Sequence, residues 1–257
     1  MAELTRDQIL QKLRRGEKLE RLDLRGIDLS KAALAGAALA RADLEGANLE
    51  AVNLSKAVLK NASLREAYLV GADLREANLE SADLEGAKLE RANLAGANLT
   101  RANLEGANLA RANLMGARLA FAQLGTANLT GADLRRAVFT HAGLEEAALG
   151  AVKASEASFA SANLRGATLV DGDFARASFA EATLCEARMA SAKLMGATLA
   201  KADLSRADLT KVDFSEADLR HATLTGARLG GTRVTGAKLD VRGYELRFFH
   251  QTERWRG

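Results

Sequence analysis

The stretch ANLEGANLARANLMG, residues 102–116, contains three copies of one five-residue unit. The unit reads Ala–polar–Leu–polar–polar, and it recurs as ADLEG at residues 42–46 and as ADLRE at residues 72–76. From Leu24 to Leu239 every fifth residue is apolar, which gives 44 positions without a slip, and 36 of them are leucine. An internal repeat of fixed period is the mark of a solenoid, a propeller or another repeat array.

A period of five fits neither regular secondary structure. On an α-helix five residues advance by about 500°, so successive leucines would not form one stripe. On a straight strand the odd spacing would place alternate leucines on opposite faces. Within a unit, however, Ala–x–Leu alternates in the manner of a strand, and the two outward residues that follow require a bend. Glycine at the last position, as in Gly26 and Gly106, is typical of a tight corner. The unit therefore predicts a coil of short extended pieces joined by corners.

These units resemble the pentapeptide repeat family, whose unit is written A(D/N)LXX. The resemblance covers residues 22–241 and implies an all-β solenoid. The implied fold is a right-handed, quadrilateral, parallel β-helix with four units in each coil. Residues 22–241 then make about 11 coils, a rod of roughly 50 Å at the usual strand spacing. The chain contains no proline, which fits an uninterrupted backbone ladder because proline cannot donate to one.

The two ends are expected to cover the open ends of the rod. The sequence of residues 1–21 predicts an N-terminal capping helix. Thr5 and Gln8 fit a capping box, and the apolar face of the helix continues toward the first coil. Residues 242–257 predict either a C-terminal cap or a dimerisation segment, and the two alternatives carry equal weight. We expect a homodimer through this segment. Its aromatic residues are Tyr244, Phe248, Phe249 and Trp255.

One section of the rod departs from the leucine pattern. Phe139, Phe159 and Phe179 are separated from one another by four units, so they are expected to stack on one wall. Gly172 and Ala154 replace larger residues near Phe174, which indicates volume compensation in a dense core.

Composition excludes several other classes of protein. A single cysteine, Cys185, cannot form an internal disulfide, and three histidines are too few for a typical zinc site. No apolar run approaches the ~18 residues of a membrane span, and the N-terminus lacks a secretory h-region, so we expect a cytoplasmic protein with no membrane partner. A filled rod offers no pocket in which reactive groups converge. We therefore expect no enzyme, no catalytic or metal-binding residues and no cofactor.

The surface is then the expected site of function, and its charge differs from wall to wall. The units around Leu24, Leu44 and onward to Leu224 form the first wall, which holds 11 acidic and 4 basic residues. The other walls, in chain order, carry net charges of +2, +1 and +3. The acidic residues expected to bind a partner are Asp43, Glu45, Asp83, Glu85, Glu105, Glu145 and Glu146.

A second candidate surface lies on the fourth wall, around Leu39, Leu59 and onward. Arg101, Phe121 and His141 should stack in one outward column, with Arg118 beside them. An exposed phenylalanine flanked by arginine is typical of an anchor for a protein partner.

The function predicted from these features is a non-catalytic protein-interaction scaffold. Some members of the family resemble DNA in size and charge and bind DNA gyrase or topoisomerase IV, which protects these enzymes against quinolones. The acidic wall fits such a partial DNA mimic, although the other walls are not acidic. The alternative is an adaptor or accessory protein of another bacterial system, such as a secretion apparatus. Direct nucleic-acid binding is not expected because no wall is strongly basic.

Overall fold

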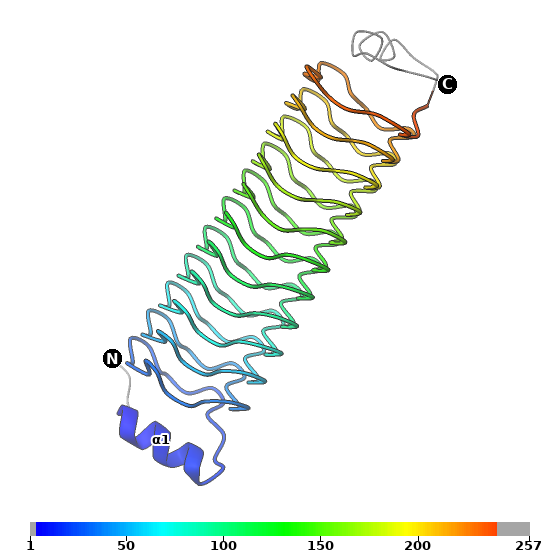
Figure 1. Ribbon diagram of the computed structural model, residues 1–257. Helices are drawn as coiled ribbons and strands as arrows, with labels where there is room; N and C mark the ends of the chain where they lie inside the picture. Colours follow the sequence, from blue (N-terminus) through cyan, green and yellow to red (C-terminus); the bar gives the residue numbers. More distant parts are fainter. Residues whose placement is uncertain (1–3, 241–257) are drawn as a thin grey trace.

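The computed structural model describes residues 4–240, which form a long rod of stacked turns with α1 (Arg6–Arg14) across one end (Figure 1). Parallel bridges join each bridged residue to its counterpart four units later, from Asp23 with Asp43 to Asp218 with Lys238. Successive bridged positions are one unit apart, so each turn consists of four units and has four sides. The strand on each side is a single bridged residue. The turn of four units expected from the sequence is therefore confirmed.

Backbone hydrogen bonds between successive turns hold the sides together. Leu104 N–H donates to the Gln123 carbonyl at 2.7 Å, and Gln123 N–H donates back to the Ala102 carbonyl at 3.0 Å. The same pair of bonds recurs along the rod, one pair for each unit. Because the central leucine of a unit donates to the next turn, proline at that position would delete a ladder bond.

The polar residue between alanine and leucine has two structural roles. Asn103 Oδ1 accepts from the backbone N–H of Glu105 at 3.1 Å, which closes the local turn. In other units the amide also links two turns, since Asn128 Nδ2 donates to Asn108 Oδ1 at 3.2 Å. Both roles need a short side chain with an oxygen acceptor, which explains the preference for Asp and Asn in the second position of the unit.

Every corner of the rod has a left-handed backbone. From residue 21 to residue 236 each fifth residue has a φ between 51° and 73°, and only 14 of these 44 corners are glycine. The corners that glycine indicated are thus present, and most corners are formed by other residues. Arginine, lysine, glutamate and even phenylalanine adopt the same conformation, although it costs an L-residue about 1–2 kcal/mol. The ladder on both sides of each corner imposes it.

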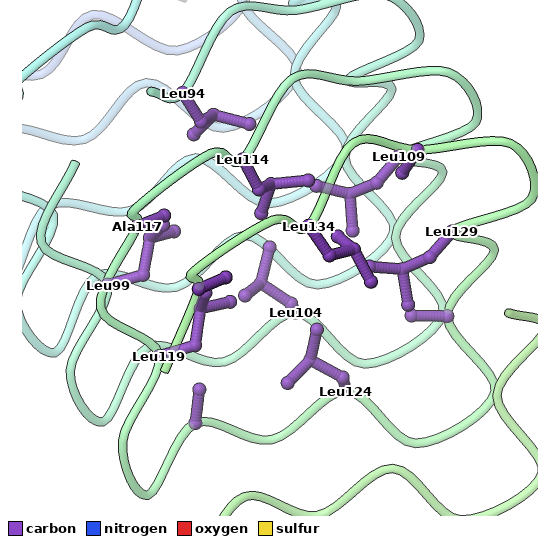
Figure 2. Packing of buried hydrophobic residues seen from close by; sticks show 14 of the residues in the cluster. Leu94, Leu99, Leu104, Leu109, Leu114, Ala117, Leu119, Leu124, Leu129 and Leu134 are labelled. Carbon is purple, nitrogen blue, oxygen red and sulfur yellow. The ribbon is translucent and has the colours of Figure 1, made fainter. Parts of the chain in front are cut away.

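The core is a set of leucine columns that run along the rod axis. Figure 2 shows Leu94, Leu114 and Leu134 pointing inward one above another, and the other labelled leucines form similar columns. These side chains are fully buried, as are nearly all the alanines two positions earlier. A fully buried leucine stabilises a fold by about 1.5–3 kcal/mol relative to an exposed one, so the core columns are the main source of stability.

The phenylalanine section packs as expected. The rings of Phe139, Phe159 and Phe179 are parallel, with centroids 4.9 Å apart at each step. Phe174 meets the stack edge-on, 6.0 Å from Phe159 and 5.5 Å from Phe179. A Cβ on Gly172 would lie 2.4 Å from Cε2 of Phe174, so the glycine makes room for the ring. The volume compensation predicted for this glycine is thus confirmed.

The N-terminal helix covers one end of the core. The capping box is confirmed, because Thr5 N–H donates to Gln8 Oε1 at 2.7 Å and Gln8 N–H donates to Thr5 Oγ1. Ile9 is fully buried against the first turns. Arg6 donates to the Ser30 carbonyl at 2.9 Å and to the Asp28 carbonyl at 3.3 Å, so it satisfies acceptors at the edge of the ladder. The helix ends at Arg14, well inside the 1–21 segment assigned to it from the sequence.

Corner strain predicts opposite effects for two matched substitutions. At Ala51, where φ is 51°, Ala51→Gly should raise the free energy of unfolding by about 0.5–1 kcal/mol. At Gly46, where φ is 63° and an added Cβ would meet no atom within 4 Å, Gly46→Ala should lower it by about 1 kcal/mol. Urea denaturation of both variants checks this, and changes of the same sign would contradict the corner-strain account.

Gly172→Ala should destabilise the rod by about 1–3 kcal/mol because the new methyl group overlaps the Phe174 ring. Phe174→Leu should relieve this cost, since leucine occupies the same column at Leu134 and Leu194. The double variant is therefore expected to be more stable than the sum of the single changes predicts, by about 1 kcal/mol or more. Additive losses in thermal denaturation would show that the two side chains are not coupled.

Candidate functional site

The first wall carries all the carboxylates assigned to partner binding, and salt bridges divide them into two groups. Three of the seven have an arginine partner: Arg25 lies 3.5 Å from Asp43, and Arg65 pairs with both Asp83 and Glu85. Within residues 4–240 the other four take part in no salt bridge. These four are Glu45, Glu105, Glu145 and Glu146.

Arg65 bridges two carboxylates of the first wall. Its guanidinium donates to Asp83 Oδ2 at 3.1 Å and makes two bonds to the Glu85 carboxylate, one of them 2.8 Å long. This contact lowers the pKa of Glu85, and Asn103 Nδ2 adds a further bond to that carboxylate. Glu85 therefore stays ionised at neutral pH, and Arg65 offsets one of the two carboxylate charges that it contacts.

Further uncompensated charge of the first wall lies beyond Arg65 along the rod. Glu105 and Glu146 are exposed, and Glu145 is half-buried and accepts from Asn163 Nδ2. No arginine or lysine of the first wall lies between Arg65 and Arg165. We call Glu105, Glu145 and Glu146 the acidic centre. Because its carboxylates form no salt bridge with any residue from 4 to 240, the acidic centre offers negative charge to an external partner.

Some carboxylates are neutralised within their own unit, as Asp23 is by Arg25 on the first wall. Arg75, Arg135 and Arg220 each form a two-pronged pair with the aspartate two residues before them, for example Arg220 with Asp218 at 2.6 Å. The Arg220 guanidinium lowers the pKa of Asp218 to about 2. Such pairs leave little net charge for long-range attraction.

The fourth wall brings the second candidate set together. The rings of Phe121 and His141 stack with centroids 5.0 Å apart and planes 15° from parallel. The Arg101 guanidinium carbon lies 5.8 Å from the centroid of Phe121. Phe121 is 48% exposed, and Arg118 is exposed on the same wall. We call these four residues the aromatic corner, because Phe121 occupies a corner between the fourth and first walls.

A shallow hollow on the second wall was not anticipated from the sequence. It measures about 520 Å³ and is lined by apolar Val70 and Ala110 and by Glu90, Arg91 and Arg111, among others. Glu90 Oε1 accepts from Asn108, whereas Glu90 Oε2 is buried without a hydrogen-bond partner. The small side chain of Ala110 between larger neighbours makes the hollow, and the five-residue pattern alone does not single out that position.

Metal ligands, membrane spans and the C-terminal aromatic residues complete the survey of candidate sites. Within residues 4–240 no three His, Cys, Asp or Glu side chains are placed to hold a metal ion. No helix among the same residues is long and apolar enough to span a membrane. Tyr244, Phe248, Phe249 and Trp255, assigned to the cap or dimer contact, lie outside the described residues.

The repeat agrees with known proteins in sequence and in structure. The family described as pentapeptide repeats matches in eight copies, at residues 18–50, 53–91, 92–131, 112–153, 144–179, 162–200, 173–210 and 202–240. Comparison with curated proteins gave no match.

Two solved structures illustrate the likeness. HetL, a pentapeptide repeat protein involved in heterocyst differentiation regulation in the cyanobacterium Nostoc sp. strain PCC 7120, is 35% identical. That match covers 91% of this chain and 97% of HetL, with a TM-score of 0.52. A trypsin-treated variant of QnrB1, a plasmid-mediated fluoroquinolone resistance protein, is 20% identical over 85% of this chain and 94% of its own, with a TM-score of 0.48. The chain therefore belongs to the pentapeptide repeat family, whose members fold as right-handed β-helices and generally act as structural or interaction proteins.

Proposed function

We propose that this protein is a non-catalytic interaction scaffold that binds a basic protein surface through its first wall. The observation that carries the proposal is the acidic centre. Its three carboxylates form no salt bridge with residues 4–240. Within the same residues, 6 of the 11 carboxylates of the first wall lack a salt bridge, against 5 of the 16 on the other walls. A partner with a complementary basic groove gains more attraction here than on the other walls, whose net charges are positive.

The most concrete partner is a type II topoisomerase, DNA gyrase or topoisomerase IV. These enzymes hold duplex DNA in a basic channel, and a straight rod with a row of carboxylates can occupy such a channel in place of phosphates. A rod of about 11 coils has the length for this role. The mimicry is limited to one wall, because the other three are weakly positive.

A second candidate is an adaptor or accessory protein of another bacterial system, with no role at a topoisomerase. Two observations favour it. The repeat runs through 44 units without an insertion, so no loop projects from the rod to add specificity for an enzyme. The solved structure that matches over 91% of this chain belongs to a protein involved in the regulation of heterocyst differentiation.

A supercoiling assay with purified DNA gyrase, with and without ciprofloxacin, tests the first candidate. The parent protein should inhibit supercoiling or reduce drug-induced cleavage. Reversal of the acidic centre by Glu105→Lys, Glu145→Lys and Glu146→Lys should weaken that effect by about tenfold or more, because three attractive contacts become repulsive. If the parent protein affects neither reaction, the topoisomerase proposal is wrong and the adaptor proposal remains.

The matched control reverses three carboxylates on other walls: Glu50→Lys, Asp171→Lys and Glu216→Lys. These residues are exposed and, within residues 4–240, form no salt bridge, so the net charge changes equally. The control should retain most of the inhibition. An equal loss in both triple variants would assign the effect to overall charge and not to the first wall.

We also propose that residues 242–257 join two copies of the chain end to end. Light scattering should then give a dimer for residues 1–257 and a monomer for residues 1–241. A monomeric full-length chain would contradict this proposal. The cytoplasmic location expected from the sequence likewise stays a prediction.

A further inference from the structure

We propose that the aromatic corner is a docking site for a short acidic segment of a partner protein that carries one aromatic or large aliphatic side chain. This inference goes beyond the proposed function, because it concerns a different wall and a partner of opposite charge. It rests on the exposure of Phe121, on the cations around its ring and on its left-handed backbone conformation.

Phe121 is displayed and not buried. Its ring stands between two neighbours along the rod axis, with Arg101 at 5.8 Å and the parallel imidazole of His141 at 5.0 Å. These neighbours cover the two faces of the ring, so the exposed part is its edge. An approaching aromatic side chain meets that edge in the T-shaped arrangement that aromatic pairs favour.

The charges around the ring select an acidic segment. The four carboxylates of the fourth wall all have a partner: Glu80 with Lys60, Glu181 with Lys201, Asp218 with Arg220 and Asp240 with His221. Arg101 and Arg118, in contrast, form no salt bridge with any residue from 4 to 240. Two exposed guanidinium groups next to an exposed ring can therefore pair with carboxylates from outside the chain.

The part of the first wall directly beside Arg101 and Phe121 carries no charge that would repel such a segment. The outward residues of that wall nearest the aromatic corner are Asn103, Gln123 and Gly143, which are uncharged. The Glu105 carboxylate lies beside Gly125, toward the opposite edge of the wall, whereas the Glu145 carboxylate lies beside Gly143 and accepts from Asn163. A short peptide can thus lie over the fourth wall, whereas a long nucleic acid strand would also meet the acidic centre.

The fold itself gives no reason for a phenylalanine at this corner. Phe121 has a φ of 61°, a conformation that a bulky side chain adopts at a cost. Asn61 and Ser81 occupy the same column of corners with φ of 56°, and asparagine tolerates this region better than most residues. A costly, exposed ring at a position that asparagine can fill is better explained by binding than by stability.

The test uses the full chain and a defined probe. The probe is a capped pentapeptide with tryptophan at its centre and glutamate at the other four positions. It is titrated while the imidazole proton signals are followed by NMR. The His141 signal should shift and saturate, and the His221 signal, far along the rod and paired with Asp240 at 2.7 Å, should stay in place. A version of the peptide with lysine for glutamate should produce no saturable shift.

Two matched substitutions separate binding from folding. Phe121→Asn installs the residue found at Asn61, so the melting temperature should be retained while affinity for the peptide falls by about tenfold or more. Tyr68→Asn is the control, since Tyr68 is 46% exposed beside Lys88, and Asn48 and Asn108 occupy its column. It should change affinity by less than about twofold. Arg101→Ser and Arg111→Ser form a second pair, in which only Arg101→Ser should weaken binding.

Three results would overturn the proposal. The first is no shift of the His141 signal with the acidic peptide. The second is an equal loss of affinity in Phe121→Asn and Tyr68→Asn. The third is a shift of the same signal by an oligothymidylate at lower concentration than by the peptide, which would assign the corner to single-stranded nucleic acid.

Discussion

The hydrogen-bonded ladder between turns is the constraint on which the whole molecule depends. Each unit donates to and accepts from the units directly above and below it in the neighbouring turns, so the position of every residue in its unit fixes which way its side chain points. The ladder also forces a left-handed backbone at all 44 corners, including those occupied by charged and aromatic residues. Leucine columns and the alanines beside them then fill the interior. Stability therefore comes from repetition, with each turn supported by its two neighbours.

Much of this architecture could be predicted from the sequence because one side chain type recurs at one spacing. The inward leucines, the stacked phenylalanines, the room left by Gly172 and the capping box of Thr5 each follow from residue size or hydrogen-bonding capacity. The corners were less predictable. Glycine at the last position indicated a tight corner, but the pattern does not show that charged and aromatic residues adopt the same left-handed backbone, because that conformation is set by the ladder and not by the residue itself.

The candidate sites were predictable in position and not in detail. Column arithmetic places Arg101, Phe121 and His141 together, and the structure gives their stacking geometry. The spacing also places Arg65 in the same column as Glu85, so partial neutralisation there was predictable. It does not show which carboxylates Arg65 contacts or which ones form no salt bridge, because that depends on the rotamers of long side chains. Counting charges per wall treated these carboxylates as equal. The hollow beside Ala110 was missed for a related reason, since it arises from the size difference between stacked neighbours.

The four-sided turn also links the number of units to the direction that each surface of the rod faces. Because one unit advances the chain by one side, an insertion of a single unit would leave the core intact and turn everything after it by a quarter rotation. The acidic centre and the aromatic corner would keep their relation to each other and face a different direction relative to α1. An insertion of four units, in contrast, would restore the orientation and alter only the distance between features. Orientation and spacing of binding surfaces on such a rod can therefore be varied independently, through the number of units alone.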